Sequence, residues 1–255
     1  MRRIEPAAVA GVMSREMANY RTIWKAMTFS SVLEPFVYLI AFGVGLGATI
    51  VDRVDGLEYV EFVGTGMVAT ATIFSSALPA MFGTFVKHHF QRTYDAILAA
   101  PVDVEEIVTA EMLWIGLRAG FYGCFPLIAA MAFGLDPAPG MLLVPLFCFV
   151  TALAFAAFGI AVAGSVSKID QFNYVTTLFV TPLFLVAGTF FPIDQLPEGV
   201  QIASQFNPLH HLVELVRHAC FGFEATDPLR LLGLIALAVV LWRLAIRQLT
   251  QKLID

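Results

Sequence analysis

Charged side chains are scarce in this sequence. Only 14% of the 255 residues are Asp, Glu, Lys or Arg, whereas 58% are hydrophobic. A soluble domain is nearer half apolar and about a quarter charged. Several segments run for roughly 18 residues or more with one charge or none, and in water such helices would lack a polar face. The composition therefore excludes a soluble helical core and predicts an all-α integral membrane protein.

Cysteine is also scarce, and its three positions are far apart. Cys124, Cys148 and Cys220 lie in or near apolar segments and show neither CxxC spacing nor an even disulfide framework. We interpret them as small buried residues. A cleavable signal sequence is not evident, because the first long apolar run begins only near Met27.

A nucleotide-binding loop is missing as well. No Gly-x4-Gly-Lys-Ser/Thr string occurs, and the nearest match, Gly159 to Gly164, continues with Ser165 inside an apolar run. The Gly116 and Gly120 pair in another apolar run indicates close helix packing instead. The chain therefore cannot bind ATP through a phosphate loop, and we expect it to hold no cofactor.

Metal and catalytic patterns are equally weak. Two histidine pairs, His88-His89 and His210-His211, lie at membrane boundaries. Adjacent residues on a helix point about 100° apart, so neither pair forms the i, i+4 clamp of a zinc site. We predict no metal site and no catalytic residue in this chain.

What the sequence does contain is long apolar runs. Each of six runs can cross a hydrocarbon core of about 30 Å at about 1.5 Å per residue. Backbone groups in lipid must be paired internally, so we expect each run to be a transmembrane helix. The six runs lie near 27–51, 60–86, 107–134, 140–166, 172–191 and 229–248.

The segment before the first run is amphipathic. Over residues 6–25, apolar side chains recur at steps of three and four, and charged side chains fill much of the rest. That pattern is typical of a helix in the membrane interface, with Tyr20 and Trp24 at head-group depth. We therefore divide the chain into a cytoplasmic amphipathic interfacial helix, 1–26, and a six-helix transmembrane domain, 27–255.

The Lys and Arg residues predict that both termini are cytoplasmic. Eleven of them lie in the N-terminal segment, near 87–106, at Lys168 and at the C-terminal end, whereas three lie in the other connections. Under the positive-inside rule the first group faces the cytoplasm.

The cytoplasmic connection 87–106 is too long to be a simple turn. A short helix is predicted over Arg92–Ala100. It ends at Pro101, because the proline ring disfavours helical geometry at the preceding residue.

The external connection 192–228 is also long. Asn207 and Pro208 are typical of a helix start, with Asn as the N-cap and Pro at the first helical position. The helix that follows, Leu209–Phe221, is too short to cross a bilayer, so it lies at the outer interface or re-enters the membrane.

Two charges inside the predicted spans are informative. Glu34 lies in the first run and Arg118 in the third, at what we expect to be a similar depth of about 10 Å from the inner surface. An unpaired charge there costs at least about 2.5 kcal/mol. We predict that Glu34 and Arg118 form an intramembrane pair; the alternative is that each reaches the interface separately.

Taken together, these segments resemble the membrane subunit of ABC transporters of the type-2 exporter family. Within it, the chain is most similar to the NodJ-like permeases of nodulation-factor export. The similarity is strongest in LEPFVYLIAFGVGLG (33–47), RVDGLEYVEFVGTGMVAT (53–70), QRTYDAILAAPV (91–102), TPLFLVAGTFFPIDQLPEGVQ (181–201) and FNPLHHLVELVRHACFG (206–222).

The resemblance implies a homodimer in a bacterial inner membrane. It also implies two copies of a separate ATPase subunit that hold ATP and Mg and dock under the cytoplasmic connection. Their closure would push on the short helix and drive alternating access. Tyr94, Ile97 and Leu98 would be the apolar plug of this ATPase-coupling helix, with Arg92 and Asp95 as polar flanks. Without the resemblance, the stretch is a plain interfacial loop helix.

The function expected from the resemblance is outward transport of an amphiphile: a lipo-oligosaccharide, a lipid-linked glycan or a hydrophobic drug. One alternative is a membrane-embedded enzyme, for which Glu34 would need a second carboxylate at matching depth. Another is a passive channel, which the lack of a polar ring on one face of the spans disfavours.

Overall fold

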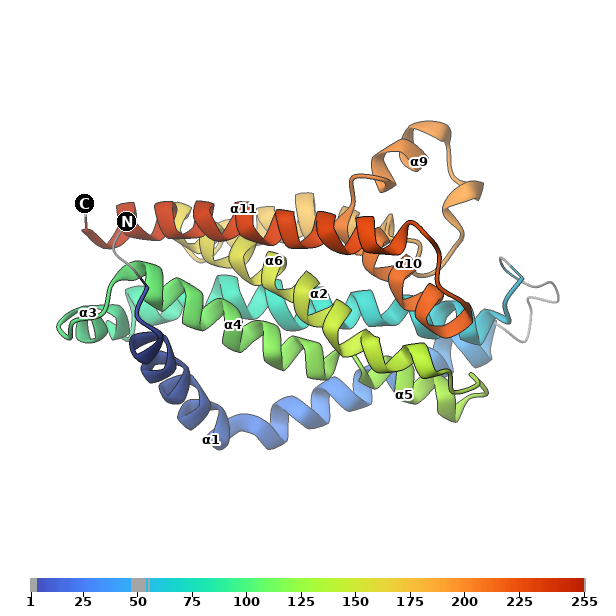
Figure 1. Cartoon of the computed structure of the whole chain (residues 1–255), viewed down its shortest axis with the longest axis horizontal. Coiled ribbons are helices and arrows are strands. Elements are labelled where there is room, and N and C mark those ends of the chain that lie inside the picture. Colours follow the sequence, from blue (N-terminus) through green and yellow to red (C-terminus); the bar gives the residue numbers. More distant parts are fainter. Residues whose placement is uncertain (1–3, 47–53, 55, 255) are drawn as a thin grey trace.

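The computed structural model describes residues 4–46, 54 and 56–254, without the side chains of residues 30, 32, 34, 35, 43, 44, 46 and 254. Within these ranges the chain is helical and contains no strand, apart from one isolated bridge between Val54 and Leu57. The long helices run roughly along one axis and form a bundle (Figure 1). The all-α prediction is confirmed for the described residues.

The bundle is built from long helices and from the segments that continue them (Figure 1). They are α1 (Pro6–Tyr38), η1 (Leu39–Leu46), α2 (Tyr59–His89), α4 (Val104–Tyr122), α5 (Phe125–Ala132), α6 (Val144–Ser165) and α11 (Asp227–Ile254). The short elements are α3 (Thr93–Leu98), η2 (Pro139–Leu143), α7 (Gln171–Val175), η3 (Thr176–Val180), α8 (Thr181–Leu185), η4 (Ile193–Gln195), α9 (Glu198–Ser204) and α10 (Pro208–Phe221).

Four helical segments are long and apolar enough to cross a membrane. They are Tyr59–His89, Val104–Ala132, Pro139–Ser165 and Asp227–Leu253, and they coincide with the second, third, fourth and sixth predicted spans. The other two predicted spans do not meet the same criteria of length and composition within the described residues. A count of six spans therefore stays a prediction.

The two remaining predicted spans are irregular for different reasons. In the first, α1 passes into the π-helical segment η1, and the rest of 27–51 lies outside the described residues. In the fifth, α7 and α8 flank the π-helical segment η3, and Pro182 is the second residue of α8. Proline supplies no N–H for a helical hydrogen bond, which favours such a break.

The amphipathic N-terminal segment does not end where the first predicted span begins. Residues Pro6–Tyr38 form one continuous helix, which bends away from the rest of the bundle along its course (Figure 1). Its first turns pack against α4, where Val9 and Val12 contact Ala110. Further along, Trp24 and Phe29 are exposed, as expected for side chains in lipid or at head-group depth.

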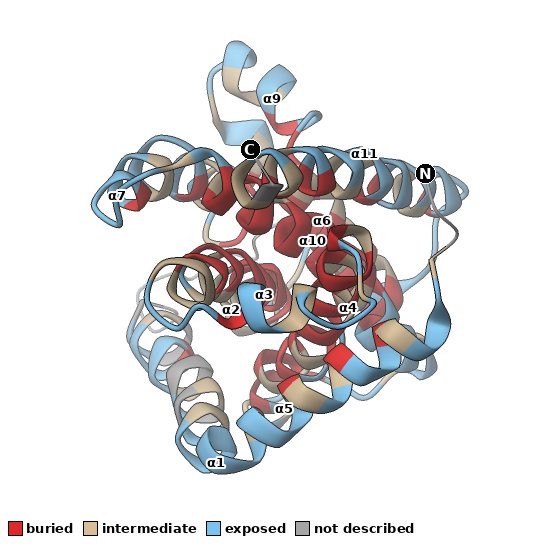
Figure 2. Ribbon diagram, turned by 90° about the vertical axis from the view of Figure 1, so that its left-hand side faces the viewer, coloured by how far each residue is buried: buried red, intermediate tan, exposed pale blue. Residues whose placement is uncertain are grey.

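The core lies where α2, α4 and α6 meet, and buried residues gather on their facing sides (Figure 2). Small residues allow these helices to approach closely. A Cβ atom on Gly159 of α6 would lie 2.6 Å from the Ala77 backbone oxygen of α2. One on Gly116 of α4 would lie 2.7 Å from a Leu153 methyl carbon, which confirms the packing interpretation of that glycine pair.

The predicted external helix is present as α10, with the predicted cap. Asn207 Oδ1 accepts a hydrogen bond from the Leu209 N–H at 3.0 Å, and Pro208 is the first helical residue. The Arg217 guanidinium carbon lies 3.8 Å from the centre of the Phe62 ring, and its Nη2 donates to the Gly188 carbonyl at 2.7 Å. These contacts hold α10 against α2 rather than at a distance from the bundle.

The two ends of the bundle carry different elements. The start of α1, the end of α11 and the short helix α3 lie at one end, whereas α9 and α10 lie toward the other (Figure 1). This arrangement agrees with the predicted placement of 87–106 on the side of both termini. Which end faces the cytoplasm stays a prediction from the Lys and Arg distribution.

Candidate functional site

Five polar side chains from four helices meet at the α3 end of the bundle. We call Arg15, Glu16, Lys87, Tyr94 and Glu111 the polar network. Lys87 Nζ lies 2.8 Å from Glu111 Oε1 and 3.0 Å from Glu16 Oε1. Arg15 Nη1 lies 3.0 Å from the same oxygen of Glu16. Cations and anions therefore alternate from α1 through α2 to α4.

Tyr94 joins α3 to this network. Its side chain is fully buried, and its hydroxyl donates to the Glu111 carboxylate, at 3.0 Å from Oε1 and 2.9 Å from Oε2. Burial, and then the Glu111 charge, raise the pKa of Tyr94 well above its usual value. The phenol is therefore neutral at physiological pH and remains a hydrogen-bond donor to Glu111.

Balanced charge explains how these side chains tolerate burial. The Glu111 side chain is only 2% exposed, and those of Lys87 and Glu16 are 16% and 9% exposed. A buried ion is costly unless it is paired and its remaining lone pairs or protons are bonded. The Thr84 hydroxyl supplies a further donor to Glu111, at 3.4 Å from Oε2. Removal of one member would leave its partner incompletely compensated.

The short helix α3 has two distinct faces. Tyr94 is on the inner face, and Ile97 and Leu98 are half-buried, with Ile97 near Val9 and Val12 of α1. Arg92, Asp95 and Ala96 are exposed on the outer face. Arg92 Nη1 and Asp95 Oδ2 are 3.4 Å apart, a solvent-exposed pair that contributes little to stability.

Comparison with known proteins decides the family. The model of the ABC-2 type transporter family matches residues 8–221. The chain belongs to this family. Nodulation protein J of Rhizobium leguminosarum bv. trifolii is 32% identical over 222 residues, which cover 86% of this chain and 84% of that protein.

Two further relatives span different degrees of similarity. Nodulation protein J of Sinorhizobium fredii (strain NBRC 101917 / NGR234) is 34% identical over 205 residues, covering 79% of this chain and 78% of that protein. The inner membrane transport permease YadH of Escherichia coli (strain K12) is 24% identical over 245 residues, covering 96% and 95%. ABC-2 permeases are the membrane components of ABC transporters and work with an ATPase partner.

A short helix is present where the ATPase-coupling helix was expected, and one of the residues expected to take part in coupling is buried. A helix was predicted over Arg92–Ala100, and α3 occupies Thr93–Leu98 within it. Tyr94 was expected in the apolar plug of that helix, together with Ile97 and Leu98, and the structure buries its side chain inside the protein's own bundle. The buried carboxylate of Glu111 supplies the reason, because it accepts the Tyr94 hydrogen bond.

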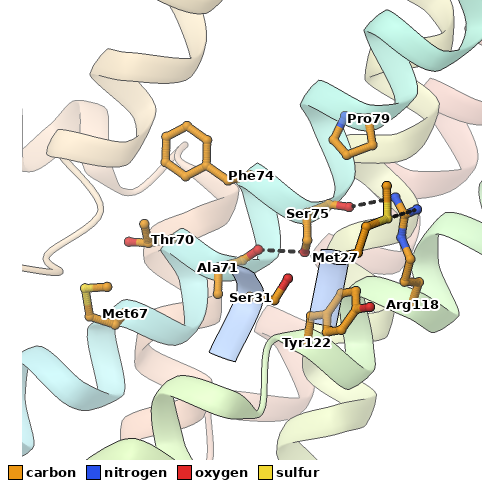
Figure 3. Close-up of a pocket in the computed structure, with 10 residues that line it drawn as sticks. All are labelled: Met27, Ser31, Met67, Thr70, Ala71, Phe74, Ser75, Pro79, Arg118 and Tyr122. Atoms are coloured by element: carbon orange, nitrogen blue, oxygen red, sulfur yellow. Dashed lines mark hydrogen bonds between the residues drawn. The ribbon is translucent and has the colours of Figure 1, made fainter. Parts of the chain in front are cut away.

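The structure describes only one side chain of the predicted pair of Glu34 and Arg118, that of Arg118. The Glu34 side chain lies outside the described residues, so its pairing stays a prediction. Arg118 Nη2 donates to the backbone carbonyl of Ser75 at 3.5 Å, and Ser75 lies near the midpoint of α2 (Figure 3). Arg118 is therefore deeper in the bundle than the 10 Å or so expected from the sequence.

The interpretation of the sequence missed Glu111, Lys87 and Glu16. Glu111 falls within the third predicted span, and Lys87 directly follows the second. A carboxylate just inside an apolar run is expensive and is expected to have a partner. The same rule that singled out Glu34 therefore applied to Glu111, and the basic residue at the end of the neighbouring span was the natural candidate.

Proposed function

We propose that this chain is the membrane subunit of an ABC exporter that moves an amphiphilic substrate outward. The observation that carries this proposal is α3: its outer face is free of contacts with the bundle, and its inner face is anchored through Tyr94 to Glu111. A helix built in this way can receive a partner outside and transmit its movement inside. The family supports an ATPase as that partner.

The polar network supplies the connection from α3 to the spans. Movement of α3 shifts the Tyr94 hydroxyl, which is hydrogen-bonded to Glu111 of α4. Glu111 in turn holds Lys87 at the end of α2, and Lys87 holds Glu16 of α1. Displacement of α3 would therefore be shared by three long helices, through charged contacts that are costly to break. In the proposed cycle, this displacement opens the path to the outer face.

The proposed assembly is a homodimer of this chain with two ATPase subunits in a bacterial inner membrane, with both termini cytoplasmic. ATP and Mg would be held by the ATPase subunits. The proposed substrate is a lipo-oligosaccharide, a lipid-linked glycan or a hydrophobic drug. The similarity to nodulation protein J and to the inner membrane transport permease YadH supports a transport role in that membrane.

A matched pair of substitutions tests the docking of the ATPase. Ala96 lies on the exposed face of α3, and Ala203 lies on the exposed face of α9 at the other end of the bundle. A96E would place a charge in the proposed interface, where desolvation costs roughly 2 kcal/mol or more. The tagged chain would be purified from membranes of its own host, and the Mg-ATP hydrolysis that co-purifies would be measured.

We expect A96E to lower the co-purified ATPase activity by about thirtyfold, which is what roughly 2 kcal/mol corresponds to. A203E should leave it unchanged. Equal activity with both variants, at equal amounts of folded chain, would contradict docking at α3. Wild-type chain without any associated ATPase activity would contradict the proposed function itself.

A further inference from the structure

A cavity of about 240 Å³ lies between α1, α2 and α4, away from the polar network (Figure 3). It is smaller than the roughly 300–1,000 Å³ pockets that enclose drug-sized ligands, so it would suit a head group rather than a whole amphiphile. Its lining combines hydroxyl groups and a guanidinium with apolar walls. The lining residues include Met27, Met67, Thr70, Phe74, Ser75 and Arg118.

The described residues satisfy the charge in this cavity only in part. Arg118 Nη2 lies 3.5 Å from the Ser75 carbonyl, and Nη1 lies 3.7 Å from Met27 Sδ. Both contacts are long, and a guanidinium has five N–H donors to satisfy. Among the side chains that the structure describes, no carboxylate lies within ion-pair distance of Arg118. A cation at this depth calls for an anion. A ligand that supplies this anion is the alternative to the pairing with Glu34 that the sequence predicts.

A second polar group that lines the cavity has no hydrogen-bond partner among the described residues. Thr70 is only 6% exposed, and its hydroxyl oxygen makes no hydrogen bond to any described residue. A buried hydroxyl without a partner costs roughly 1–3 kcal/mol. Threonines in α2 at Thr65 and Thr72 bond to backbone carbonyls of their own helix, so Thr70 differs from its neighbours. The Thr70 oxygen has almost no exposed surface in this conformation, so a rotation of its side chain about χ1 would bring the hydroxyl to a ligand in the cavity.

We propose that this cavity binds the anionic head group of a membrane amphiphile. Arg118 supplies the countercharge, Thr70 donates a hydrogen bond, and Met67 and Phe74 contact the apolar part next to the head group. Phosphate and carboxylate both fit a guanidinium through paired N–H donors. Binding at this site requires only the chain described here and does not depend on an ATPase.

The depth of the cavity connects it to transport. Ser75 and Arg118 lie near the middle of candidate spans, whereas the head group of an ordinary lipid lies at the interface. A charged head group at this depth would be on its way across the membrane. The inference that the exported amphiphile is anionic rests on the proposed function.

Native mass spectrometry of the purified chain tests the binding. The probes are dioleoyl phosphatidylglycerol, which is anionic, and dioleoyl phosphatidylcholine, which has the same acyl chains and no net charge. R118Q removes the proposed countercharge, and R243Q removes an exposed arginine of α11 as the matched control. We expect R118Q to weaken binding of the anionic lipid at least tenfold and R243Q to leave it unchanged. Phosphatidylcholine should not distinguish the variants.

Two further variants keep the test decisive if R118Q folds poorly. R118K retains the charge without the paired donors, so it should retain part of the affinity. T70V removes the hydroxyl at nearly constant volume and should weaken binding severalfold. Inorganic phosphate at millimolar concentration separates the two sources of the anion: displacement of the lipid indicates recognition of the head group alone, and no displacement indicates that the acyl chain is required.

Three results would overturn the proposal. Binding of the anionic lipid that is unchanged in both R118Q and T70V would exclude the site. Equal loss in R118Q and R243Q would indicate general surface attraction. The third result concerns the melting temperatures in lipid-free detergent. If the effects of E34Q and R118Q are not additive in the double variant, Glu34 is the resident counter-ion of Arg118. Each result would leave the outcome of the A96E docking experiment untouched.

Discussion

The hydrogen bond from Tyr94 to Glu111 is predicted to be energetically coupled to the charge on Glu111. Y94F removes only the hydroxyl and keeps the buried ring. A hydrogen bond to a charged group is worth about 1.5–3 kcal/mol, so Y94F should lower the free energy of unfolding by that amount. E111Q should cost about 3 kcal/mol, the low end for a broken buried ion pair, because Glu16 still contacts Lys87.

The double variant measures the coupling between the two residues. Once Glu111 is Gln, the Tyr94 hydroxyl donates to a neutral amide, and its loss should cost only about 1 kcal/mol. The cycle should therefore show a coupling of about 1 kcal/mol, measured by chemical denaturation of the detergent-solubilised chain. Y174F, at an exposed tyrosine, serves as the control and should have no effect. Coupling below about 0.5 kcal/mol would refute the role assigned to this contact.

Three other predictions follow from the packing, the topology and the buried phenol. G159A should destabilise the chain by about 1–3 kcal/mol, because the added methyl group overpacks α6 against α2. G83A, whose Cβ would meet nothing within 4 Å, is the control and should be neutral or stabilising. Equal melting temperatures of the two variants would contradict the close approach of α6 to α2. In a cysteine-free background, a cysteine at Gly199 should react with an impermeant reagent from outside and one at Gln91 only from inside, so outside labelling of position 91 would reverse the orientation. Because folding raises the pKa of Tyr94, the stabilising contribution of its hydroxyl is complete below about pH 10 and is lost at higher pH. The difference in unfolding free energy between wild type and Y94F should therefore shrink above that pH. A difference that stays constant with pH would contradict a neutral donor.

The sequence predicted the long helices well because their signal is composition. Four of the predicted spans coincide with long apolar helices, and the N-cap of α10 was readable from Asn207 and Pro208. Local chemistry decides these features, since apolar runs must be helical in lipid and asparagine side chains satisfy free N–H groups. The breaks at η1 and η3 were not predicted, because no residue pattern specifies a π-helical turn.

The direction of Tyr94 could not be predicted from its own segment. A tyrosine in a short amphipathic helix can face a partner or the protein's own bundle, and the choice depends on what the neighbouring helix offers. Here Glu111 offers a buried carboxylate, seventeen residues later in the sequence. Glu16 and Lys87 meet near Glu111 because α1 and α2 both pack against α4. These helix contacts join residues that are distant in sequence.

Site-specific photo-crosslinking from Ala96 tests the central claim most directly. A photoreactive amino acid at position 96 would be illuminated in membranes of the host, and the product would be identified by mass spectrometry; the same residue at position 203 serves as the control. The account predicts that position 96 cross-links to an ATP-binding subunit, that the yield changes when ATP is added, and that position 203 gives no such product. An ATPase cross-linked from position 203 and not from position 96 would contradict the account.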